Sequence, residues 1–123
     1  MEELIARISA ATGVNADVTT KSVGIILNFL RQEGPADAVG HVMSALPGAA
    51  EAADAAQSAH EDAGGGDSGG GLMALAGHLS EAGLGMGDMQ AVGKELFAAV
   101  HEKAGPDAVG AIAGSIPGLH QFI

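Results

Sequence analysis

Residues 34–40 read GPADAVG, and residues 105–110 repeat the motif with one alanine missing, as GPDAVG. In both places a Pro-Gly pair begins seven residues after the last glycine of the motif, at residues 47–48 and 117–118. Because turn-forming residues recur at one offset of about 70, we interpret the chain as two degenerate copies of one unit. The correspondence extends upstream, to Gly13 and Gly83 and to Val23-Gly24 and Val92-Gly93.

Each copy predicts three amphipathic helices. In the first copy, apolar residues recur at helical spacing before Gly13, which is suited to end a helix. A second helix is expected over residues 17–32 and a third from Pro35 to just before Pro47, because proline is tolerated in the first turn of a helix. The expected apolar faces carry Leu4, Ile5, Ile8; Ile25, Ile26, Phe29; Val39, Val42, Leu46; and, in the second copy, Leu72, Leu75, Leu79; Met89, Val92, Leu96, Val100; Val109, Ile112, Ile116.

Two different segments separate the copies. Residues 49–62 are rich in alanine and acidic residues and predict a helix with a polar face, whereas residues 64–71 read GGGDSGGG and predict a flexible linker. We therefore predict an all-α domain of six to seven short helices, with a first unit over residues 1–48, the acidic helix and linker over 49–71, and a second unit over 72–123. The apolar tail, Leu119, Phe122 and Ile123, is expected to pack on the core.

Charge and composition exclude several classes of partner. The chain has fifteen Asp and Glu but only five Lys and Arg, which gives a formal charge of −10, and no basic cluster is present. Nucleic acid and anionic membrane surfaces are therefore not expected partners. The absence of cysteine excludes disulfides and thiolate metal sites. The start, Met1-Glu2-Glu3, does not resemble a signal peptide, so a cytoplasmic location is expected.

The glycine-rich linker matches three well-known motifs. Residues 66–70, GDSGG, resemble the sequence around the nucleophile of trypsin-like proteases and also fit the pattern G-x-S-x-G. Gly64, Gly66 and Gly69 fit the dinucleotide motif G-x-G-x-x-G. All three motifs require strands that this sequence does not predict, so we expect neither a catalytic Ser68 nor a cofactor site.

The five histidines do not form a metal-binding pattern. None belongs to H-E-x-x-H, and no two are four residues apart; they are His41, His60, His78, His101 and His120. His78 with Glu81, or the run of residues 60–62, supplies part of a ligand set, but a closed site needs three or four ligands. We expect no metal site and no bound metal or cofactor.

Four repeated glycines fall inside predicted helices, where glycine costs roughly 1 kcal/mol relative to alanine. They are Gly24, Gly40, Gly93 and Gly110. Close approach between two helices is the favoured reason for their presence. A backbone platform for a ligand is the alternative.

Two stretches carry a resemblance to bacterial domains of unknown function. Leu46-Pro47-Gly48 closes one amphipathic helix, and residues 69–76, GGGLMALA, lead into another. Over residues 65–119 the chain resembles the VcgC/VcgE-type domain, and its paired units resemble a second uncharacterised bacterial family of helical repeats. The resemblance implies a bacterial helical fold and no catalytic residues.

The sequence favours a non-catalytic interaction or scaffold module, whose partner is another protein or a second copy of this chain. The alternative is a binder of a small apolar ligand in a groove between the two units, lined by residues such as Ile26, Phe29, Leu96 and Phe97. An enzyme is not expected, because it would require groups from both copies to converge, for example His41 with Glu95 or His101. Whether the two units pack within one chain or between two chains is left open.

Overall fold

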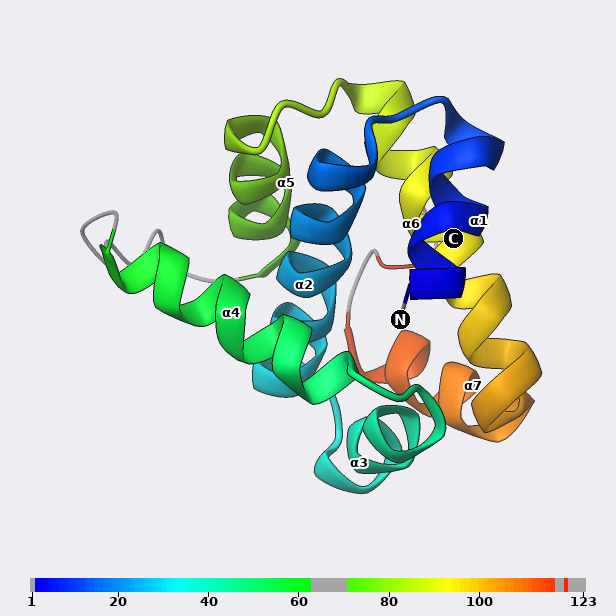
Figure 1. The fold of residues 1–123 in the computed structure, drawn as a ribbon. Helices are drawn as coiled ribbons and strands as arrows, with labels where there is room; N and C mark the ends of the chain where they lie inside the picture. The colour runs from blue at the N-terminus through cyan, green and yellow to red at the C-terminus, as the bar shows by residue number, and fades with distance from the viewer. Residues whose placement is uncertain (1, 63–70, 117–118, 120–123) are drawn as a thin grey trace.

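The computed structural model describes residues 2–62, 71–116 and 119 (Figure 1). Within these ranges the chain forms helices and no strand, which confirms the all-α prediction. The linker at residues 63–70 lies outside the described residues. The helices are α1 (Glu2–Thr12), α2 (Ala16–Glu33), α3 (Ala36–Ala45), α4 (Ala49–Asp62), α5 (Gly71–Glu81), α6 (Met86–Ala104) and α7 (Pro106–Ser115).

A glycine ends helix α1, and an asparagine side chain caps the start of helix α2. At the end of α1, Gly13 has a φ of +76°, and its N–H donates to the carbonyl oxygen of Ser9 at 2.8 Å. This left-handed conformation is cheap only for glycine. The side chain of Asn15 then caps α2 by accepting a hydrogen bond of 2.7 Å from the N–H of Asp17. At the place that corresponds to Gly13 in the second unit, Gly83 has a φ of +107°.

The helices of the two units agree in length and in how they end. Helices α1, α2 and α3 have 11, 18 and 10 residues, and α5, α6 and α7 have 11, 19 and 10. Leu46 and Ile116 occupy the same place after α3 and α7, with nearly identical backbone angles and an N–H bonded to the residue four positions earlier. The internal repeat itself stays a prediction.

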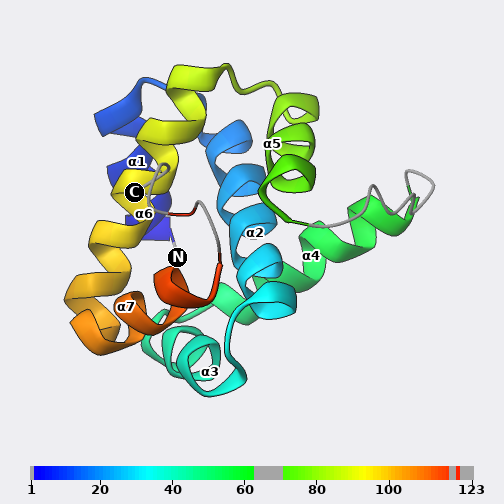
Figure 2. The same ribbon diagram turned by 180° about the vertical axis from the view of Figure 1, so that it is seen from behind.

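The two units pack against each other and share one hydrophobic core. The long helices α2 and α6 pack together in the middle, α1 packs on α6 as well as on α2, α5 packs on α2, and α3 packs on α7 (Figures 1 and 2). The fully buried side chains come from both units and include Ile8, Leu27, Leu30, Leu79, Leu96 and Ile112. In this structure the two units therefore pack on one another within one chain. Leu119 is also buried, as expected for the tail; Phe122 and Ile123 lie outside the described residues.

Helix α4 crosses α2 at a glycine. A Cβ at Gly24 would lie 2.6 Å from the carbonyl oxygen of Ala52 and 3.3 Å from the Cβ of Ala56, so only glycine permits this crossing. Ala49 and Ala53 are buried beside the crossing, while the other face of α4 is exposed. Figure 1 shows the second half of α4 extending away from the other helices. The sequence-based interpretation of Gly24 is therefore confirmed.

The same interpretation is wrong for two of the other glycines. Gly40 and Gly110 lie on exposed faces of α3 and α7, where no atom of the described residues lies within 4 Å of an added Cβ. These short helices present their opposite faces, with Val39, Val42 and Ile112, to the core. Gly93 is buried in α6.

In the described ranges, no helix has both the length and the apolar character that crossing a lipid bilayer would require.

Candidate functional site

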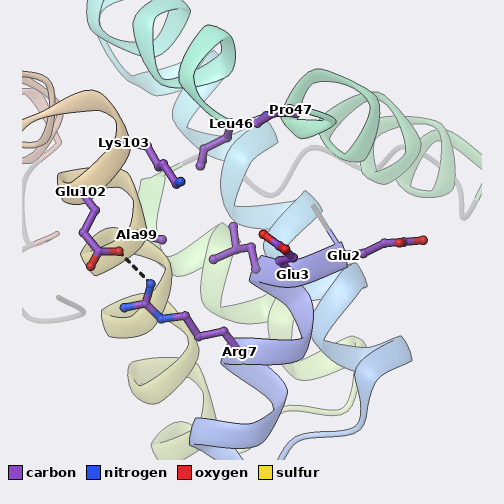
Figure 3. A pocket seen from close by; sticks show the side chains of 9 residues that line it. Glu2, Glu3, Arg7, Leu46, Pro47, Ala99, Glu102 and Lys103 are labelled. Atoms are coloured by element: carbon purple, nitrogen blue, oxygen red, sulfur yellow. Dashed lines mark hydrogen bonds and ion pairs between the residues drawn. The ribbon is translucent and has the colours of Figure 1, made fainter.

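A cleft lies along the seam between the two units (Figure 3). Its volume is about 620 Å³. One wall is the first two turns of α1, the opposite wall is the last turns of α6, and the turn between α3 and α4 closes one end. Among the described residues, nine line this seam cleft: Glu2, Glu3, Leu4, Arg7, Leu46, Pro47, Ala99, Glu102 and Lys103.

Helical spacing places these side chains on facing surfaces. Glu3 and Arg7 are four residues apart on α1, and Ala99 and Lys103 are four apart on α6, so each pair shares a helix face. Ala99 is only 2% exposed and is the smallest side chain in the lining, so it leaves depth between the walls. The cleft exists because two helices far apart in sequence pack against each other at these faces.

One ion pair joins the two walls. The Nη1 atom of Arg7 lies 2.7 Å from the Oε2 atom of Glu102, although the residues are 95 positions apart. The hydrogen bond from Arg7, together with the charge of its guanidinium, lowers the pKa of Glu102. The same contact raises the pKa of Arg7. Both side chains are about half exposed, so solvent screens the pair and it contributes little to stability.

The end of the cleft is shaped by the chain reversal after α3. The N–H of Leu46 donates to the carbonyl oxygen of Val42 at 3.0 Å, and Gly48 then turns the chain with a φ of +86°. This turn buries Leu46 beneath the cleft and leaves Pro47 exposed at its edge. The Pro47-Gly48 pair thus ends α3, as expected, and also closes the site.

The four residues expected to line an apolar groove lie in the hydrophobic core. Ile26, Phe29, Leu96 and Phe97 are at most 8% exposed and belong to the shared hydrophobic core. The expectation that they line an open groove was therefore wrong. Long side chains at the centre of two packed helices fill the space between them. The described cleft lies at the edge of the seam instead, where Ala99 is small.

The histidines do not gather in the cleft. The Nε2 atom of His41 lies 2.9 Å from the carbonyl oxygen of Ala104, and this hydrogen bond joins α3 to the end of α6. No hydrogen bond or ion pair of the described residues joins His41 to Glu95 or His101. His101 is exposed on α6, and His78 is half-buried on α5.

Within the described residues, no three His, Asp or Glu side chains are placed to hold one metal ion. The side chain of His60 lies outside the described part, as do Ser68, the glycines of residues 64–70 and His120. The interpretations of these residues as not catalytic, not cofactor-binding and not metal-binding therefore stay predictions.

Comparison with known proteins identifies no relative: no family model matches the chain, and neither a curated protein nor a solved structure matches it significantly. The resemblance to the VcgC/VcgE-type domain stays a prediction.

Sequence reasoning assigned no function to the residues that line the cleft. Leu4 and Leu46 were expected only as core residues, and the charged residues on the rim belong to no motif. No pattern in the sequence links Arg7 to Glu102, because Glu3, four residues earlier on the same helix, is an equally available carboxylate.

Proposed function

We propose that this chain is a non-catalytic interaction module of the cytoplasm that binds a segment of a protein partner in the seam cleft. The observation that carries the proposal is the composition of the lining. Five of its nine residues carry charge, around a floor of Leu4, Leu46 and Ala99. Protein-binding surfaces combine an apolar centre with a polar rim in this way.

The charged residues on the rim are available to a partner. Glu2, Glu3 and Lys103 are exposed and form no ion pair with another described residue. Carboxylates accept charge-assisted hydrogen bonds and an ammonium donates them, and such groups at a rim control association rate and specificity. Because helices hold both walls, the cleft is formed before a partner arrives, which lowers the entropic cost of binding.

A small apolar ligand in the same cleft is the second candidate. Its volume falls within the range of about 300–1,000 Å³ that is typical of small-molecule sites. The lining argues for the first candidate, because small-molecule sites are mostly apolar whereas charged residues form the majority here.

The proposal is tested by filling the cleft. Ala99→Leu adds bulk between the walls, and Ala98→Leu adds the same bulk on an exposed face of α6 as a matched control. A protein partner captured from cells by the wild-type chain and by Ala98→Leu should bind Ala99→Leu at least about tenfold more weakly. Equal binding by all three chains would refute the role of the cleft.

Two further measurements complete this test. The double variant Glu3→Gln/Lys103→Gln changes exposed side chains and should weaken the same complex without altering the fold, so the test survives a failure of Ala99→Leu to fold. Sedimentation over a concentration series then identifies the partner class. A mass of two chains would replace the protein partner with a second copy, and a single-chain mass at all concentrations supports a different protein.

A further inference from the structure

The charges that line the seam cleft are distributed unequally between its two walls. Arg7 and Glu102 neutralise one another at 2.7 Å. Of the remaining charged residues, the carboxylates Glu2 and Glu3 lie on α1 and the ammonium of Lys103 lies on α6. A ligand in the cleft therefore meets an anionic wall on one side and a cationic donor on the other.

Glu3 and Lys103 are the two charged side chains best placed to act on such a ligand. In Figure 3 the Glu3 carboxylate and the Lys103 ammonium extend from opposite walls toward the region of Leu46, while Glu2 points away from the cleft. Leu46, at the closed end of the cleft, and Ala99, on the α6 wall, supply apolar surface to the same cleft. One acceptor, one donor and an apolar floor thus surround one space.

We propose that the seam cleft recognises a peptide segment of the partner in which an aliphatic side chain adjoins a lysine or arginine. The aliphatic side chain packs against Leu46, and the small side chain of Ala99 leaves room for it. The partner's cation donates to the Glu3 carboxylate, and the Lys103 ammonium donates to a main-chain carbonyl oxygen of the segment. This inference rests on the proposed function and adds the chemistry of the partner.

The charge of the whole chain favours the same partner. At −10, it attracts a cationic segment and repels an anionic one, which raises the association rate of the first. A peptide is favoured over a free amino acid because a cleft of about 620 Å³, open at the rim between α1 and α6, holds several residues of an extended chain.

The test uses capped tetrapeptides and amide chemical shifts of the ¹⁵N-labelled full chain. Acetyl-Ala-Leu-Arg-Ala-amide should shift the amides of residues 2–7, 46–47 and 99–103 and bind at least about tenfold more tightly than the peptide with glutamate in place of arginine. The peptide with alanine in place of leucine should also bind more weakly. Glu3→Gln should reduce the preference for arginine over glutamate severalfold, whereas Glu81→Gln, an exposed site at the end of α5, should not.

The remaining outcomes separate this inference from the proposed function. If the anionic peptide shifts these amides and the cationic one does not, the partner chemistry is wrong and the cleft stays a protein-binding site. If free leucine binds as tightly as the peptide, the ligand is an amino acid and the inference fails. If no probe shifts these amides, the inference also fails, and the capture experiment with Ala99→Leu decides the proposed function independently.

Discussion

Replacing Gly24 with alanine tests how α4 is held on α2. In an unobstructed helix the change from glycine to alanine stabilises by up to about 1 kcal/mol. At Gly24 the new Cβ would lie 2.6 Å from the backbone oxygen of Ala52, which cannot turn aside as a flexible side chain can. Relieving the clash requires α4 to shift, at the usual cost of overpacking, about 1–3 kcal/mol.

Gly40→Ala is the matched control, because Gly40 also lies within a helix but an added Cβ there has no atom of the described part of the chain within 4 Å. We expect Gly24→Ala to be less stable than Gly40→Ala by about 1–3 kcal/mol, which is the cost of the clash alone, since both variants share the gain in helix propensity. Urea unfolding measures the difference. Equal stability of the two variants would refute the close packing of α4 on α2.

Hydrogen exchange shows where the destabilisation falls. If α4 detaches before the bundle unfolds, Gly24→Ala should speed amide exchange in residues 52–58 and leave the buried turns of α6 unchanged. An effect of the same size across both helices would mean that α4 unfolds only with the whole domain.

Three further predictions follow from the core, a cap and the ion pair. Leu27→Ala removes a fully buried side chain from the first unit, and Leu96→Ala removes one from the second. Each should lower the free energy of unfolding, measured in urea, by about 2–5 kcal/mol. A loss of stability confined to one unit would contradict the shared core. Asn15→Ala removes the cap of α2 and should cost about 1 kcal/mol by the same assay, while no change would mean the cap is replaced by water. Arg7→Met should raise the pKa of Glu102 toward its ordinary value in an NMR titration. Because the folded-state pKa of Glu102 is lowered, the contribution of the pair to stability is present above the pKa of an unfolded-state glutamate and is lost as the pH falls through the folded value. The wild-type chain and Arg7→Met should therefore converge in stability in acid.

The helices could be located from sequence because their ends carry residues with specific backbone roles. Gly13 and Pro35 mark a helix end and a helix start that the structure shows within a residue of the expected positions. A close approach at Gly24 could be predicted because a glycine inside a long helix needs a reason. The same reasoning failed at Gly40, since sequence does not show which face of a short helix meets a neighbour.

The seam cleft could not be predicted, because it depends on tertiary packing. Its walls come from residues 2–7 and 99–103, and no motif links them. The contact between Arg7 and Glu102 spans 95 positions and follows only from the packing of α1 on α6. Sequence reasoning placed the groove among large core residues, where side chains fill the space, instead of beside the small Ala99.

The seam cleft exists only if its two walls meet within one chain. A nitroxide attached to Glu102→Cys, in a chain with no other cysteine, should strongly relax the amides of residues 2–7 when the labelled chain itself carries ¹⁵N. The second sample mixes chains that carry the nitroxide but no ¹⁵N with chains that carry ¹⁵N but no nitroxide. This mixture should show no such relaxation. Relaxation in the mixture as well would mean that a second copy supplies the opposite wall, and relaxation in neither sample would mean that the seam does not form.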